Sequence, residues 1–389
     1  MSEWRKVKFL DLFALPSRNG LTKPSRVRGS GYKMINMGEL FSNGRIYDIP
    51  MELVPLNDKE KEVAKVERYD LLFARQSLVL EGAGKCSIVM DVSDLTTFES
   101  HLIRVRLDYN IANPLFYYYY FSSSLSPISS IVSQCAQAGI KGSDLVQIMV
   151  DFPPLHIQHR IATILSSYDT LIENYQKQIK LLEESAQRLY KEWFVDLRFP
   201  GHENVQIVDG VPKGWEKKKA GDLISKVRRT KQVSANNYLN SGYIPVIDQS
   251  RNYIAGYTND IESLVEVTIP YIVFGDHTRV LKYVPFSFAK GADGTQLIMS
   301  NDLERMPQSL FYNSLIEIDL SNYSYARHFK YLKEESILVP SKDIAQRYDK
   351  VVSQYCQSIQ KSRDQIRHLT EARDRLLPKL MNGEINVNC

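Results

Sequence analysis

Residues 161–182, with the sequence IATILSSYDTLIENYQKQIKLL, contain apolar residues at alternating steps of three and four and lack Pro and Gly. This spacing lines the apolar side chains along one narrow stripe of a helix, as in helices that pack lengthwise on a partner helix. The pattern therefore predicts a long helix near the middle of the chain and raises the question of where its partner lies.

An internal repeat supplies that partner. Moving the segment 153–189 forward by 187 positions places it on 340–376 without a gap, and a shift of 211 places Trp4 on Trp215. Matching pairs at the first shift include Pro153 with Pro340, Arg160 with Arg347, Tyr168 with Tyr355 and Leu189 with Leu376. A repeat of this kind marks a duplicated structural unit. We therefore expect a globular region, a helix, a second globular region and a second helix.

The two helices are predicted to pair along a seam of apolar residues. The seam consists of Ile161, Leu165, Tyr168, Ile172, Tyr175, Ile179 and Leu182 in the first helix, and Tyr348, Val352, Tyr355, Ile359, Ile366, Leu369 and Leu376 in the second. Each helix should have about 33–36 residues and a length of about 50 Å, and Pro378 should end the second. Connectivity makes the pair antiparallel. The alternative is that both are core helices of a larger domain.

The globular regions mix strand and helix signals. DLLFARQ, CSIVMDV, YIPVID and PYIVFGD have the apolar runs of strands, SLIEIDL is strand-like, and PLFYYYYFSSS suits a helix or a buried amphipathic segment. The predicted fold is mixed α and β, with two repeated globular domains separated by two long antiparallel coiled-coil helices and an approximate two-fold axis. The predicted boundaries are 1–154, 155–200, 201–339 and 340–389.

Composition narrows the function classes. The 389 residues are 43% hydrophobic and carry a net charge of +4, which neither demands nor excludes a nucleic-acid partner. Cys86, Cys135, Cys356 and Cys389 lack CxxC spacing, so we expect no disulfide framework and no metal site. Without a signal-peptide core or a run of about 18 apolar residues, we expect a soluble, cytoplasmic protein with no membrane partner.

Two sets of loops contain residues suited to DNA. Basic residues among Gly and Ser suit phosphate contacts; these are Lys23, Arg26, Arg28 and Lys33 in the first region and Lys226, Arg228, Arg229 and Lys231 at the corresponding place in the second. Residues that can bond base edges are Arg75 and Gln76 in FARQ, and Asp276, His277, Thr278 and Arg279 in FGDHTRVLK. The alternative for each residue is a solvated surface group.

Catalytic motifs are mostly missing. DFPPL (151–155) lacks the arrangement of a [DN]PP[YF] methyltransferase turn, and GAGKCS lacks the spacing of a phosphate-binding loop. A nuclease metal site at Asp209, Glu216 and Lys218 would lack supporting strands. The sequence therefore favours a binding protein and predicts no catalytic residues. Two competing hypotheses are a coiled-coil structural adaptor with two protein-binding domains and an enzyme with an unrecognised site.

Four stretches together resemble the DNA-specificity (S) subunit of Type I restriction–modification systems. They are YDLLFARQSLVLEGAGKCSIV, YIVFGDHTRVLKYVPFSFAKGADGTQLI, DFPPLHIQHRIATIL and RHFKYLKEESILVPSKDIAQRYDKV. The GADGTQ form and the duplicated helix entries are the more specific features. The family usually has a Pro-Pro pair followed by Glu-Gln, whereas this chain has His156 and Gln158 at the first entry and a single Pro340 at the second.

The resemblance implies a concrete function. Each globular domain would be a target recognition domain for one half of a bipartite, asymmetric DNA site, and the helices would set the unread gap. The helices would also dock two methyltransferase subunits, and restriction/translocase subunits would join the full complex. The chain itself would hold no cofactor; S-adenosylmethionine, ATP and Mg would be bound by the partner subunits.

Overall fold

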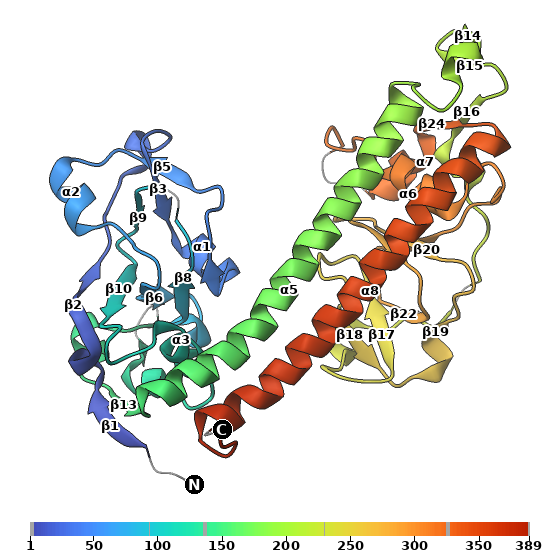
Figure 1. Ribbon diagram of the computed structural model, residues 1–389. Coiled ribbons are helices and arrows are strands. Elements are labelled where there is room, and N and C mark those ends of the chain that lie inside the picture. The colour runs from blue at the N-terminus through green and yellow to red at the C-terminus, as the bar shows by residue number, and fades with distance from the viewer. Residues whose placement is uncertain (1–3, 93, 135–137, 229, 324–326, 388–389) are drawn as a thin grey trace. The chain divides into compact units, whose positions relative to one another are not determined.

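The chain folds into two compact units in the computed structural model, which describes residues 4–92, 94–134, 138–228, 230–323 and 327–387. Unit 1 comprises Met1–Glu173 with Arg367–Cys389, and unit 2 comprises Asn174–Ile366. Each unit therefore contains one globular region together with part of each long helix, seen in green and red in Figure 1.

Both predicted long helices are present. Helix α5 (Leu155–Tyr190) has 36 residues and continues into a π-helical turn at Lys191–Val195, and helix α8 (Lys342–Met381) has 40 residues. The prediction that Pro378 ends the second helix is wrong. A proline removes one backbone donor, but Pro378 lies within the last turn, and its carbonyl accepts the backbone N–H of Asn382 at 3.0 Å.

Within each unit the start of one helix packs against the end of the other. In unit 1, Ile161 and Leu165 of α5 share the core with Leu380 and Met381 of α8. In unit 2, the core holds Tyr190 from the end of α5 with Tyr348 and Val352 from the start of α8. The two helices are therefore antiparallel, as connectivity predicted.

Burial along the predicted seam is strongest where the helices enter the cores. The buried seam residues are Ile161, Leu165, Ile172, Tyr348, Val352 and Ile359. The half-buried seam residues are Tyr168, Tyr175, Ile179, Leu182, Tyr355, Ile366, Leu369 and Leu376. Ser362 interrupts the apolar pattern at a buried position, and its hydroxyl donates to the Ser358 carbonyl at 2.9 Å, which satisfies the polar group.

The main sheet of unit 1 has the strand order β2–β10–β6–β8–β4. Its strands are β2 (Phe13–Asn19), β10 (Leu102–Leu107), β6 (Leu71–Ala74), β8 (Cys86–Val89) and β4 (Arg45–Ile46). The Tyr-rich segment forms helix α3 (Pro114–Ser122), whose aromatic side chains pack in the core of the unit. Three residues of β6 and β8 in this core, Leu71, Phe73 and Ile88, are buried, which explains the apolar runs in the sequence.

Smaller elements complete unit 1. Strand β1 (Arg5–Lys8) pairs with β13 (Met149–Phe152). A second small sheet contains β5 (Glu52–Val54), β3 (Tyr32–Ile35) and β9 (Thr96–Phe98). A third contains β11 (Ser133–Gln134), β12 (Ala138–Gly139) and β7 (Gln76–Ser77). The short helices are α1 (Met37–Ser42), α2 (Asp58–Val63) and α4 (Gly142–Leu145).

Unit 2 contains two larger sheets and two short helices. The four strands of the first sheet are, in order, β18 (Gly256–Thr258), β17 (Ile244–Ile247), β22 (Phe288–Lys290) and β19 (Leu264–Val265). The three strands of the second are, in order, β21 (Leu281–Val284), β20 (Tyr271–Gly275) and β23 (Thr295–Ile298). The remaining elements are β14 (Ile207–Val208), β15 (Val211–Pro212), β16 (Glu216–Lys219), β24 (Ser336–Val339), α6 (Gln308–Ile316) and α7 (His328–Glu334). The strand expected at SLIEIDL is wrong, because its first three residues complete α6, where Leu310, Phe311 and Leu315 share a buried helical face.

The sequence repeat corresponds to repeated structure. The shift of 211 carries β1 onto β16, and the shift of 187 carries β13 onto β24. In both units these two strands pair antiparallel, and the second strand leads into the long helix. None of the helices in the described ranges is long and apolar enough to cross a membrane.

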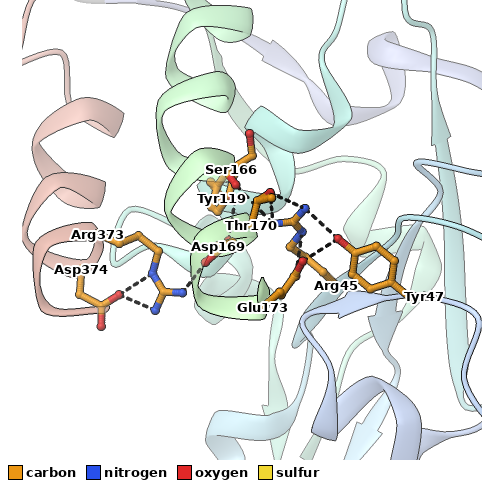
Figure 2. A network of polar contacts seen from close by, with 9 residues as sticks. All are labelled: Arg45, Tyr47, Tyr119, Ser166, Asp169, Thr170, Glu173, Arg373 and Asp374. Carbon is orange, nitrogen blue, oxygen red and sulfur yellow. Dashed lines mark hydrogen bonds and ion pairs between the residues drawn. The ribbon is translucent and has the colours of Figure 1, made fainter. Parts of the chain in front are cut away.

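A buried polar network occupies the seam of unit 1 (Figure 2). Asp169 of α5 accepts hydrogen bonds from the Tyr119 hydroxyl of α3 and from the Arg373 guanidinium of α8, both at 2.6 Å. Burial would lower the pKa of Arg373, but the hydrogen bonds to Asp169 and Asp374 outweigh it and raise the pKa. Arg373, which breaks the apolar pattern, therefore joins the two helices to α3.

We predict that Arg373→Ala destabilises the chain by about 2 kcal/mol, because the buried Asp169 carboxylate loses its cationic partner. Urea unfolding followed by helical circular dichroism measures the change. Arg375→Ala is the matched control, because Arg375 is exposed on the same helix, and its effect should stay within about 0.5 kcal/mol. Equal destabilisation by both substitutions would contradict the role of the Asp169–Arg373 pair.

Candidate nucleic-acid interface

The predicted base-contacting residues lie on hairpin loops with equivalent strand frames. In unit 1 the loop joins antiparallel strands β6 and β8, and in unit 2 it joins antiparallel strands β20 and β21. In each unit the first of these strands also pairs antiparallel with a third, β10 or β23. The loops therefore leave the same place in two copies of one frame, although they differ in length and composition.

Arg75 and Gln76 begin the unit 1 loop and are half-buried. Their backbones are fixed, because Arg75 donates to the His101 carbonyl at 2.7 Å and Gln76 pairs with Gly139 between β7 and β12. Within the described residues neither side chain has a hydrogen-bond or ion-pair partner. The backbone thus fixes where both side chains begin, and their N–H groups remain available to donate hydrogen bonds to a ligand.

The basic segment of unit 1 is largely neutralised by acidic partners. Lys23 pairs with Glu60 at 2.8 Å, Arg28 with Glu52 at 2.6 Å, and Lys33 with Asp48 at 2.5 Å. These ion pairs connect the segment to α2, to β5 and to the loop that contains Asp48, and the predicted DNA contacts of the three residues stay untested. Arg26 is exposed and has no ion-pair partner among the described residues, so it is the cation of this segment with the most freedom to bind a phosphate.

The hairpin turn of unit 2 exposes His277, Thr278 and Arg279. Arg279 adopts a left-handed backbone conformation (φ 62°) and donates to the Leu320 carbonyl at 3.0 Å. Asp276 differs, because it is only 4% exposed and its carboxylate accepts the backbone N–H of Phe329 in α7 at 2.8 Å. Asp276 therefore has a structural role, and its predicted contact with a base stays untested.

Gln249 joins three loops of unit 2. Its side-chain oxygen accepts the His277 backbone N–H at 3.1 Å, its backbone carbonyl accepts the Thr278 hydroxyl at 2.6 Å, and its side-chain nitrogen donates to Asp293 at 3.0 Å. Gly294 has a φ of 77°, a left-handed backbone conformation that favours glycine, and it lies against the Gln249 side chain. The GADGTQ loop thereby contacts the hairpin turn at a surface that includes exposed basic residues.

The basic segment of unit 2 retains two exposed cations, Lys226 and Arg228. Lys231 is also exposed, but it pairs with Asp260 at 2.8 Å and Glu262 at 3.3 Å. Arg229 lies outside the described residues. Among the described residues Lys226 and Arg228 have no ion-pair partner, whereas Lys231 in the same segment is paired.

Sequence reasoning missed Lys282, which holds the loop that follows β17. Its ammonium donates to the carbonyls of Asp248 at 2.8 Å and Asn252 at 2.5 Å. Burial lowers the pKa of Lys282 to about 8, although the Asp248 carboxylate favours the charged form. The loop between these carbonyls carries the exposed Arg251.

Sequence reasoning also missed a second repeated feature, an Arg-x-Tyr triplet in each globular region. Tyr47 donates to Glu173 of α5 at 2.8 Å, and Tyr253 donates to Gln360 of α8 at 3.3 Å. Glu173 and Gln360 are themselves related by the shift of 187. Comparing GRIYD with SRNYI would have revealed this attachment of each globular region to a long helix.

Among the described residues no group of three or more His, Cys, Asp and Glu is arranged to hold a metal ion. Burial raises the pKa of Cys86 well above its ordinary value and that of Cys356 to about 12. These two thiols are therefore poor nucleophiles near neutral pH.

Known proteins match both the sequence and the fold. Residues 1–184 match the family model described as the Type I restriction modification DNA specificity domain. The MjaIX specificity subunit of Methanocaldococcus jannaschii is 26% identical over 321 residues, covering 75% of this chain and 73% of that protein. A putative MjaX specificity subunit from the same organism is 24% identical and covers 99% of this chain and 94% of that protein.

A solved structure supports the assignment at the level of fold. The Type I restriction–modification S subunit from M. genitalium has a TM-score of 0.62 and is 18% identical, with 97% of this chain and 96% of that chain covered. It shares the mixed architecture with two domains and long helices. The chain is therefore similar in sequence and in fold to the specificity subunits of Type I restriction–modification systems.

Proposed function

We propose that this chain is a Type I restriction–modification specificity subunit that binds a bipartite, asymmetric DNA site, with unit 1 reading one half and unit 2 the other. When bound to this DNA site, the chain directs the methyltransferase and restriction subunits to it. The proposal is supported by the match of residues 1–184 to the DNA specificity domain and by the two copies of the strand frame with its hairpin loop.

The difference between the two hairpin loops is the observation that carries the proposal. Arg75 and Gln76 begin one loop, whereas His277, Thr278 and Arg279 form the exposed turn of the other. Arg pairs best with guanine and Gln with adenine in the major groove. Two equivalent frames with different donors favour two different half-sites, and hence a target that is not a palindrome.

The long helices are the proposed attachment for the other subunits. Their seam is occupied by intramolecular packing, and their outer faces carry exposed charges such as Lys180 and Arg188. We propose that two methyltransferase subunits dock here, one for each half of the repeat, and that restriction/translocase subunits complete the complex. In this assembly S-adenosylmethionine, ATP and Mg belong to the partner subunits, and the helices set the unread gap.

Genome-wide mapping of adenine methylation tests the proposal in cells that express this chain with its methyltransferase subunit. We expect one split motif with two different halves, which disappears when this chain is deleted. A coiled-coil adaptor would leave no such motif. Methylation that persists without this chain would overturn the proposal.

We predict that removing Lys226 and Arg228 together weakens DNA binding on every sequence. Each lost phosphate contact should reduce the slope of log affinity against log salt by about 0.9, so the double alanine variant should lose about 2. Lys231→Ala is the matched control, because Asp260 and Glu262 already neutralise that lysine. Titration of a duplex at several salt concentrations measures the slope; an equal loss in both variants would contradict the prediction.

We predict that Arg75→Ala and Arg279→Ala relax different halves of the motif. Each side chain leaves an equivalent hairpin in a different unit, so each loss should remove discrimination at one base position, worth about 1–3 kcal/mol. Methylation mapping of the two variants identifies the relaxed positions. Relaxation of the same half by both variants, or of neither half, would be evidence against the division between units.

We predict that Lys282→Met destabilises unit 2 and that the difference from wild type grows above about pH 8. A lysine with a folded pKa of about 8 holds fewer protons than its unfolded form at 10.5, so wild-type stability rises with pH between these values. The relative gain should be about 1 kcal/mol between about pH 8 and about pH 9. Urea unfolding of both proteins measures it; a pH-independent difference would refute the lowered pKa.

A further inference from the structure

Three consecutive apolar residues stand exposed on the unit 1 hairpin loop. Leu78 is 89% exposed, Val79 59% and Leu80 46%. We call these three residues the apolar tip. Single exposed apolar residues are ordinary, whereas a contiguous group beside polar ligand-binding chemistry marks a contact surface.

The apolar tip is held by specific local structure. The Ser77 hydroxyl accepts the Val79 backbone N–H at 3.2 Å, and Val79 and Leu80 accept the N–H groups of Gly82 and Ala83, each at 3.2 Å. A Cβ at Gly82 would lie 2.2 Å from Ser77 Oγ, so glycine is needed for this close packing. The tip is therefore preformed, which lowers the entropic cost of binding a ligand.

The tip borders a hollow of about 550 Å³ that also includes polar groups able to bond a base edge. Gln76 and His101 line it together with the apolar Met37 and Phe41. Arg75, whose side chain has no partner among the described residues, precedes Gln76 in the chain. None of the described residues that line the hollow is acidic, so the hollow combines apolar surface with the polar side chains of Gln76, Ser77 and His101.

Duplex DNA is the occupant that this chemistry fits. The C5-methyl group of thymine is the apolar feature of the major-groove base edges, and it lies beside the adenine edge that Gln bonds. The tip also falls within the segment 1–184 that matches the DNA specificity domain. The corresponding turn in unit 2 has polar His277, Thr278 and Arg279, so an apolar contact of this kind would distinguish the two half-sites.

We propose that the apolar tip contacts the C5-methyl group of a thymine in the half-site read by unit 1, where Gln76 bonds the adenine of the same pair. This inference rests on the proposed function of the chain. Leu78 and Val79 would then determine specificity by excluding water from one methyl group, and Leu80 would support them. The assignment is carried by an exposed leucine, Leu78, close to a glutamine, Gln76, whose side chain has no hydrogen-bond partner among the described residues.

Substitution of thymine by uracil tests the contact, because it removes only the C5-methyl group. The complex of this chain with its methyltransferase subunits is titrated with duplexes of the mapped site in which each thymine is replaced in turn. At one thymine of one half-site, wild type should lose about fourfold in affinity, the factor expected for burying one methyl group. The Leu78→Ala/Val79→Ala variant should bind more weakly and show no difference between thymine and uracil there.

Ile261→Ala provides the matched control, because Ile261 is an exposed apolar residue (78%) in unit 2; it should retain the wild-type response to uracil. A response to uracil that persists in the tip variant, or no response at any thymine, overturns the inference while the proposed function stands. Loss of the methyltransferase subunits from the tip variant would also overturn the inference and leave the proposed function standing. Failure of wild type to bind the mapped duplex would overturn the proposed function and, with it, this contact.

Discussion

The burial of both ends of both long helices within the globular cores is the constraint on which the structure depends. The core of unit 1 includes Ile161 and Leu165 from the start of α5 with Leu380 from the end of α8, and unit 2 pairs the opposite ends. Neither core is complete without both helices. Because burying a large apolar side chain contributes about 1.5–3 kcal/mol, these contacts couple helix pairing to the folding of each unit.

This constraint explains why the sequence predicted the architecture well. Most seam positions are apolar, with Ser362 and Arg373 as exceptions, and the strands that lead into the helices pair in the same way in both repeats. The shifts of 187 and 211 therefore fall on β13 and β24 and on β1 and β16. The errors arose where a local pattern was ambiguous: Pro378 came too late to break α8, and Ile316 belongs to α6 although SLIEIDL alternates like a strand.

The candidate site was less predictable, because charge in a sequence does not reveal which partner will neutralise it. Lys23 meets Glu60 and Lys231 meets Asp260, residues distant in sequence, whereas Arg26 and Arg228 in the same segments remain exposed. Asp276 looked like a base-contacting residue, but folding brings α7 onto its carboxylate. These outcomes depend on tertiary contacts that neither composition nor local spacing encodes.

The contrast between fixed strands and variable loops supports the proposal that two equivalent frames read different DNA half-sites. Residues in β6 and β20 are fixed by pairing on both sides, so substitutions there disturb a core. Loop residues contribute little to either core and vary at much lower cost. An apolar tip follows one frame and a polar turn follows the other. Under the proposed function, DNA specificity would therefore depend on the loops that folding constrains least, while the helices and strands that carry them retain the repeat.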